Sequence, residues 1–199
     1  MLNKILIQRV QSLYSKGVQS DDTRLSNRHI YSKLLTLRNK LLAQKIKKNQ
    51  KINAWNYQTL RCVELVKVSE IDCPCICVKG CMTLRTKYKL PKPLTDLGRH
   101  IIQYVTGINP SNNETLIFNE TTVQNKNYRI YDKYTGTKRD FYIYDDYLYI
   151  TNDKELEIIN IVGIFSDPEE VDKFVTACSE ETPDCTSMLD KEFRLDEDL

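Results

Sequence analysis

The chain has 199 residues, 41% of them hydrophobic, and a net charge of only +2, which suits one domain or a small pair with a sizeable core. No apolar run reaches the ~18 residues of a membrane-spanning helix, and the start of the chain lacks the pattern of a secretory signal peptide. We therefore expect a protein made and used in a reducing cytoplasm, where its seven cysteines stay largely reduced.

The charge is distributed unevenly along the chain. Residues 1–61 carry thirteen Lys and Arg against two Asp and Glu, a net of +11, whereas residues 165–199 carry three against twelve, a net of −9. Such polarity indicates different partners for the two ends of the chain. It is compatible with nucleic acid at the basic end, or with head-to-tail docking between copies that closes into a ring.

The first part of the chain has helical periodicity. Apolar side chains recur at helical spacing over residues 2–15, and Ser26 is suited to cap a second helix. That helix, predicted over about 27–50, carries two apolar rows on one face and exceeds the average length of a globular helix. Its opposite face is basic and holds Arg28, Lys33, Arg38, Lys40, Lys45, Lys47, Lys48 and Lys51.

This basic face has two interpretations. It is either a solvated helix face, or a surface that lines a DNA channel or contacts neighbouring subunits. Non-specific binding to nucleic acid requires only clustered Lys and Arg. The face is not accompanied by a zinc-finger, ribonucleoprotein or P-loop signature, so the pattern alone leaves both interpretations open.

A third helical piece is predicted from Ala54 to about Val66, with Asn53 as its N-cap. Five of the seven cysteines, Cys62 among them, lie in or at the edge of the segment that joins this piece to the second half, Val63–Pro93. The prolines of this segment argue against a regular central element. A short strand is nevertheless expected within Cys81–Leu90.

Four of these cysteines are crowded within nine residues: Cys73, Cys75, Cys77 and Cys81. Thiolates are good zinc ligands, but structural zinc sites usually combine two well-separated pairs. The other interpretations are a disulfide, or small, buried, reduced side chains in an irregular strand. We favour the last, and we expect no cofactor.

From residue 101 onward the hydrophobic period changes to two, which is typical of strands. Asp145-Asp146 is expected to form a tight hairpin turn. Asp167 and Pro168 are expected to start a short helix that ends near Cys178, before an acidic C-terminal segment. Strands are predicted over Ile101–Ile108, Thr115–Phe118, Val123–Tyr131, Phe141–Tyr144, Tyr147–Ile150 and Glu157–Phe165.

The predicted hairpin collects tyrosines on one face. Alternation along the two strands places four of them together as two cross-strand pairs, Tyr142 and Tyr144 against Tyr147 and Tyr149. A sheet face covered with tyrosine is either a protein interface or merely an amphipathic surface.

No catalytic pattern is present. The two histidines, His29 and His100, have no Cys or Asp partner at a diagnostic spacing. The nucleophile-elbow, zinc-protease and P-loop motifs do not occur either. We therefore expect a protein that is not an enzyme.

Two stretches of the sequence resemble a known family. They read QRVQSLYSKGVQSDDTRLSNRHIYSKLLTLRNKLLAQKIKK with NAWNYQTLRCVEL, and SEIDCPCICVKGCMTLRTKYKLPKPL. Over roughly Leu2–Tyr104 the chain is similar to a virion structural protein of crAss-like bacteriophages, in particular to the head-to-tail connector rings. The resemblance implies a homo-oligomer, twelve-fold as in podovirus adaptor rings, at the head-tail junction of a virion assembled in the host bacterial cytoplasm. Its implied partners are the portal, other tail proteins and the genomic DNA in the channel, and no membrane.

The predicted fold class is α+β. We divide the chain into a helical docking and oligomerisation region (1–68), a Cys/Pro-rich connector (69–100), an antiparallel β domain (101–166), and a short helix with an acidic segment (167–199). The predicted function is a connector ring between portal and tail, in which the acidic C-terminal segment binds a basic patch on an adjacent chain. The alternative is a small basic nucleic-acid-binding protein stabilised by zinc.

Overall fold

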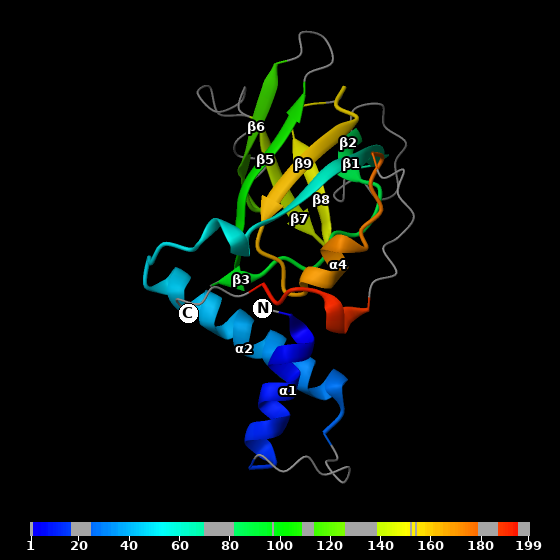
Figure 1. Cartoon of the computed structure of the whole chain (residues 1–199). Coiled ribbons are helices and arrows are strands. Elements are labelled where there is room, and N and C mark those ends of the chain that lie inside the picture. Colours follow the sequence, from blue (N-terminus) through cyan, green and yellow to red (C-terminus); the bar gives the residue numbers. More distant parts are fainter. Residues whose placement is uncertain are drawn as a thin grey trace.

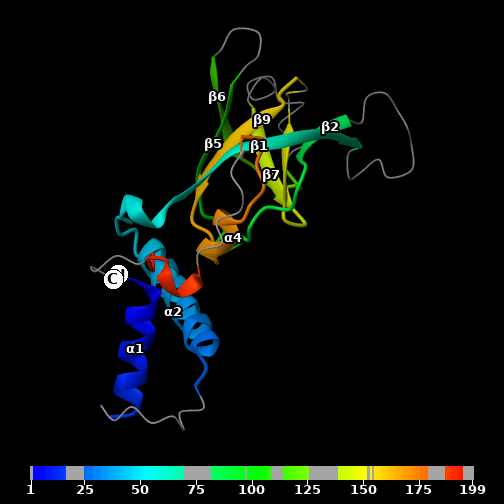
Figure 2. The same ribbon diagram turned by 45° about the vertical axis from the view of Figure 1, so that its right-hand side comes forward.

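Within the described residues, strands form a closed barrel and two helices pack beneath one end of it (Figure 1). A view turned by 45° shows the same arrangement (Figure 2). The computed structural model describes residues 2–16, 25–69, 82–96, 98–108, 114–125, 139–151, 153, 155–178 and 187–194.

The helices are α1 (Asn3–Tyr14), α2 (Asn27–Lys47) and α4 (Pro168–Asp172), with single 3-10 turns at Ala54–Asn56 and Met188–Asp190. A small ribbon is formed by β3 (Thr95–Asp96) and β4 (Arg99–His100). The barrel strands are β1 (Gln58–Ser69), β2 (Met82–Thr86), β5 (Ile102–Ile108), β6 (Thr115–Glu120), β7 (Asp140–Tyr144), β8 (Tyr147–Thr151) and β9 (Ile158–Gly163).

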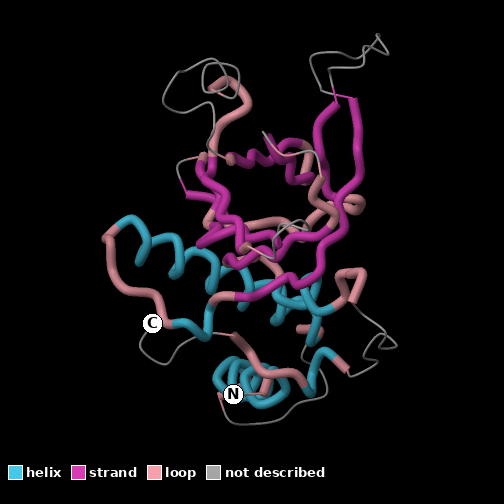
Figure 3. The backbone as a smooth tube through the Cα atoms, turned by 90° about the horizontal axis from the view of Figure 1, so that it is seen from above, coloured by secondary structure: helices cyan, strands magenta, loops and turns pink. Residues whose placement is uncertain are grey.

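The strand order around the barrel is β1-β2-β8-β7-β6-β5-β9, and β9 closes the circuit by pairing with β1. The pairing of β6 with β7 is parallel, and the other pairings are antiparallel. Figure 3 shows this circuit from above, with α2 running beneath it. Closure pairs the strand edges that an open sheet would leave exposed.

The barrel interior is the main hydrophobic core. Alternate side chains of the strands point inward, and Val105, Leu148, Ile159 and Ile161 are completely buried. Full burial of one such side chain stabilises the folded state by ~1.5–3 kcal/mol. The barrel is therefore the stable body on which the helices and the C-terminal segment are mounted.

Two smaller clusters attach the helices. α1 packs on α2 through Ile7 and Ile30, which meet Phe193 near the C-terminus. The C-terminal half of α2 packs on the barrel end through Leu42 and Ile164.

The predicted α+β class is wrong. The described chain is mostly β and is built on a closed barrel, not on a long helical region followed by an antiparallel domain. Two of the barrel strands, β1 and β2, come from the chain before residue 101, outside the predicted β domain. The barrel also contains a parallel pairing, between β6 and β7. α2 ends at Lys47 and has 21 residues. Barrel closure depends on pairing between distant segments, which hydrophobic periodicity does not encode.

The predicted third helix is also wrong, because its residues form strand β1 after one 3-10 turn. A β-bulge between Leu60 and Val63 inserts one extra residue into β1. Both side chains are buried in the barrel core although they are three positions apart. The bulge therefore imitates helical spacing in the sequence, which explains the error.

The hairpin of β7 and β8 confirms its prediction. Tyr142 pairs with Tyr149, and Tyr144 pairs with Tyr147. The turn residues Asp145 and Asp146 have φ values of +50° and +63°, as a type I′ turn requires.

Other predictions were met in part. The strand expected over Val123–Tyr131 lies partly outside the described residues, and its described beginning is a turn. Helix α4 starts as predicted, with the Asp167 carboxylate accepting a hydrogen bond from the Glu169 N–H at 2.9 Å, but it ends at Asp172. In the described ranges, no helix is long and apolar enough to cross a membrane.

Candidate interaction surfaces

The helical layer presents a positively charged surface. Helices α1 and α2 contain no Asp or Glu. Ser26 caps α2 as predicted, accepting a hydrogen bond from the His29 N–H at 3.3 Å. Lys45, which is half-buried, and Lys47 lie in the last turn, where they complement the helix dipole. The exposed basic side chains of the predicted face are Arg28, Lys33, Lys40, Lys47, Lys48 and Lys51.

Arg38 does not belong to that surface, which corrects its predicted place. It is completely buried, and its guanidinium donates hydrogen bonds to the carbonyl oxygens of Arg194 (2.6 Å) and Phe165 (3.1 Å). Burial, and secondarily the positive charge of Arg194, lower its pKa to about 10. The group therefore stays charged at neutral pH. It joins α2, the barrel end and the C-terminal segment.

The described C-terminal residues, 187–194, dock on the helices of their own chain. Leu2 and Glu192 form a β-bridge, and the Asn3 N–H donates to the Lys191 carbonyl at 2.9 Å. The Phe193 ring meets Tyr31 edge-on, with centroids 6.4 Å apart. An ion pair between Lys191 Nζ and Asp172 Oδ2 at 3.2 Å adds to these contacts. All of them lie within one chain, so the docking expected between the acidic segment and a basic patch on an adjacent chain stays a prediction.

A groove of about 880 Å³ lies between α2 and the α4 region, lined partly by Tyr31, Asn39 and Lys173. Burial, and secondarily the negative charge of the nearby Glu169 carboxylate, raise the pKa of the Tyr31 phenol above its ordinary value. The phenol therefore stays neutral at physiological pH and supplies no nucleophile.

The predicted tyrosine face is only partly at the surface. Tyr142 and Tyr149 are buried, and their parallel rings are stacked with centroids 5.0 Å apart. In the single chain they are therefore not exposed to a partner protein in the way that had been predicted. Tyr147 is half-buried, and the Arg85 guanidinium lies 4.1 Å from its ring centroid. Tyr144 remains 48% exposed. Of the four predicted interface tyrosines, Tyr144 is the one with a largely open side chain.

An apolar patch on the outer wall of the barrel was not predicted from the sequence. Ile108 of β5, Ile117 of β6 and Ile158 of β9 are 59%, 66% and 40% exposed. Ile117 lies opposite Thr106 in the ladder of β5 and β6, and Thr106 lies opposite Asn160 of β9. The outer positions of these three strands are therefore apolar or uncharged polar. Period-two alternation had indicated the strands, but apolar side chains occur on both faces of each strand, so the sequence pattern does not show that an apolar face is exposed.

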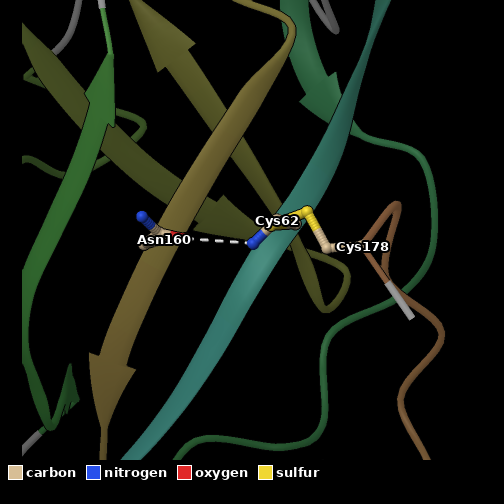
Figure 4. Close-up of a disulfide and its surroundings, with 3 residues drawn as sticks. All are labelled: Cys62, Asn160 and Cys178. Atoms are coloured by element: carbon tan, nitrogen blue, oxygen red, sulfur yellow. Dashed lines mark hydrogen bonds between the residues drawn. A yellow bond between two sulfur atoms is a disulfide. The ribbon is translucent and has the colours of Figure 1, made fainter. Parts of the chain in front are cut away.

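The reduced state predicted for the thiols does not hold for one pair. Cys62 of β1 forms a disulfide with Cys178, 116 residues further along the chain (Figure 4). Cys62 occupies the bulge with a φ of +54°, and its N–H donates to the Asn160 Oδ1 at 2.9 Å. The Cys62 sulfur is bonded to Cys178 and is therefore not a free thiol that could act with the crowded cysteines Cys73, Cys75, Cys77 and Cys81.

No metal centre is found among the residues that the structure describes, where no three His, Cys, Asp or Glu side chains are grouped to hold an ion. Cys73, Cys75, Cys77 and Cys81 lie outside those residues, so the interpretations of that cluster stay predictions. His29 is exposed on α2. His100 Nδ1 lies 3.4 Å from Glu120 Oε1.

Comparison with known proteins identifies a family. The profile described as phage tail ring protein 2, of crAss phages, matches residues 5–199. The match includes the barrel, beyond the stretch in which the sequence showed a resemblance, and it supports a structural rather than an enzymatic protein. No curated protein matches the chain. Because the match spans almost the whole sequence, the chain belongs to the phage tail ring protein 2 family of crAss phages.

Proposed function

We propose that this chain forms a homo-oligomeric connector ring, twelve-fold in the predicted form, between the portal and the tail of a phage. The genomic DNA passes through the centre of the ring. The observation that carries the proposal is the family match over residues 5–199. In this function the chain works by assembly and carries out no reaction.

The fold supplies two surfaces of different chemistry, which supports the proposal. A ring built from one chain needs two different faces, because each subunit meets one neighbour with its front and the other with its back. The outer barrel wall offers the apolar patch of Ile108, Ile117 and Ile158. We assign this patch to the contact between neighbouring copies, because burial of apolar side chains is the main favourable term in association.

The helical layer is the second surface, and we assign it to the DNA channel or to the adjacent subunit. Its exposed lysines and arginines face no acidic residue within α1 or α2. A positive wall attracts the phosphate backbone without reading the base sequence, which suits passage of a whole genome. The strength of that attraction falls steeply as salt concentration rises.

Charge reversal on the helical layer tests this assignment. Lys33→Glu with Lys40→Glu changes two exposed side chains of α2, and Lys67→Glu with Lys92→Glu makes the same charge change at exposed positions of the barrel strand β1 and of a loop. We expect only the α2 pair to weaken DNA binding or ring assembly. Equal DNA affinity and equal assembly in both double variants would remove the helical layer from the proposal.

The alternative function is a small basic nucleic-acid-binding protein. The absence of acidic residues from α1 and α2 is the observation that favours it. A chain that stays monomeric with portal and tail proteins present, and that binds DNA with a steep salt dependence, would favour this alternative over the ring. Zinc stabilisation belongs to this alternative, and metal analysis after purification without chelator tests it.

A further inference from the structure

The chain that leaves α4 is covalently fastened to the wall of the barrel at Cys62. The disulfide of Cys62 and Cys178 joins β1 to the end of the segment 173–178, and the Ala177 N–H donates to the Cys62 carbonyl at 3.0 Å. We propose that this disulfide is a redox-sensitive latch, which holds the segment on the barrel when oxidised and releases it when reduced.

The latch is accessible to a small reductant in the folded protein. Cys178 is exposed and Cys62 is half-buried. Cys62 also lines an outer pocket of about 340 Å³ together with Ile108 and Ile158. A dithiol can therefore reach the sulfur atoms without prior unfolding of the barrel, whereas a disulfide sealed in a core is shielded from exchange.

Several side chains of the segment 173–178 lie open to solvent. Val175 is 62% exposed, and Ala177 is also exposed. Phe174 is half-buried at the margin of the barrel core. The attachments of this segment in the described structure include the disulfide, this ring and the Ala177 hydrogen bond, and reduction removes the covalent one.

The barrel itself has restraints of its own. β1 is paired with β2 and β9 along its length, and the Asn160 side chain holds the Cys62 N–H independently of the sulfur atoms. Reduction is therefore expected to open the segment locally while the barrel stays closed, as sub-global opening of weakly packed regions does in general.

The reducing reagent supplies the two electrons that open the disulfide. A dithiol such as dithiothreitol attacks the protein disulfide, the bond between the Cys62 and Cys178 sulfur atoms breaks, and the reagent becomes a cyclic disulfide. Two electrons pass to the protein, and each released thiolate takes up a proton. In the opposite direction, a low-molecular-weight disulfide accepts the two electrons and the bond forms again.

The latch determines how the C-terminal part of the chain is anchored. When it is closed, that part is fixed at Cys178 and again at residues 187–194 on the helices. When it is open, the second anchor remains. A freshly made chain in a reducing cytoplasm would have the latch open, and a chain exposed to an oxidising medium would have it closed.

Peptide mapping and limited proteolysis test the latch on the full chain. Protein purified without reductant and alkylated at once should yield a linked peptide that contains Cys62 and Cys178. Trypsin should then cut after Lys173, an exposed residue, about fivefold or more faster once dithiothreitol is added, because cleavage follows the population of the open form. Cleavage after Lys67 within β1 should stay slow in both states.

Three variants complete the test. Cys62→Ser and Cys178→Ser should be cut rapidly after Lys173 with or without dithiothreitol, and Cys185→Ser should behave as the wild type. Absence of the linked peptide overturns the proposal, and so does an equal rate of cleavage after Lys173 in oxidised and reduced wild type. The comparison of oxidised with reduced wild type tests the latch even if a serine variant fails to fold.

Discussion

The Nη1 atom of Arg38 donates a hydrogen bond to the backbone carbonyl of Phe165 across 3.1 Å. The two groups belong to helix α2 and to the end of the barrel, and both residues are buried. The same guanidinium reaches the Arg194 carbonyl through Nε. This side chain therefore helps to fix the angle between the helical layer and the barrel, together with the packing of Leu42 on Ile164.

Replacement of Arg38 by Met should destabilise the chain by ~2–4 kcal/mol, because the Phe165 and Arg194 carbonyls lose a buried charged donor. Urea denaturation monitored by circular dichroism measures the change. Lys33→Met, at an exposed position of the same helix, should stay within about 0.5 kcal/mol of wild type. A loss below about 1 kcal/mol for Arg38→Met would show that the junction does not depend on this side chain.

The unfolding free energy should depend on Tyr31 at alkaline pH. The phenol has a raised pKa in the folded state and an ordinary value of 10.0 when unfolded. Above that pH the unfolded chain loses a proton that the folded chain keeps, so stability decreases as pH rises. At pH 11 this costs the wild type about 1 kcal/mol.

The variant Tyr31→Phe lacks this titration. Between pH 9 and pH 11 its unfolding free energy should fall by about 1 kcal/mol less than that of wild type. Arg38 titrates in both proteins, and its pKa is coupled to the charge of Tyr31. Parallel pH profiles for the two proteins would contradict the raised pKa of the buried phenol.

The hairpin turn offers a stabilising substitution. Asp146 has a φ of +63°, which lies in the left-handed region. Residues with a Cβ lose about 1 kcal/mol of stability there, whereas glycine does not. Asp146→Gly should therefore raise the unfolding free energy by roughly 0.5–1 kcal/mol. Asp146→Ala removes the same carboxylate but keeps the Cβ, so it should not stabilise. If both variants behave alike, the effect comes from charge and not from the backbone.

The outer barrel patch should control assembly. Ile117→Ser removes an apolar side chain that is 66% exposed in the single chain, and its burial between copies would be worth ~1.5–3 kcal/mol. The concentration at which rings dissociate should then rise about tenfold, as measured by mass photometry. Leu13→Ser, at an exposed apolar position of α1, is the matched control. A larger effect at Leu13 would move the contact between copies from the barrel to the helices.

Local structure could be predicted where one short-range signal dominates. Ser26 and Asp167 were identified as caps because their hydroxyl and carboxylate oxygens accept hydrogen bonds from N–H groups only two or three residues away. The turn at Asp145 and Asp146, with strands of period two on both sides, was equally local. The cross-strand pairs of tyrosines followed from that turn.

Features that depend on distant contacts could not be predicted. The bulge at Cys62 gives Leu60 and Val63 a helical spacing, and pairing with β9 decides in favour of a strand. Arg38 looks like one more basic residue of α2, and its burial follows from carbonyl groups more than a hundred residues away. The partner of Cys62 is likewise 116 residues distant, whereas the crowded cysteines of the join drew attention by their closeness in sequence.

The central claim is that the chain assembles into a ring around a channel. The measurement that tests it most directly is electron microscopy of the purified full chain, alone and mixed with the phage portal and tail proteins. We predict closed rings with a central opening in at least the mixed sample. Single, unassociated particles in both samples would contradict the account.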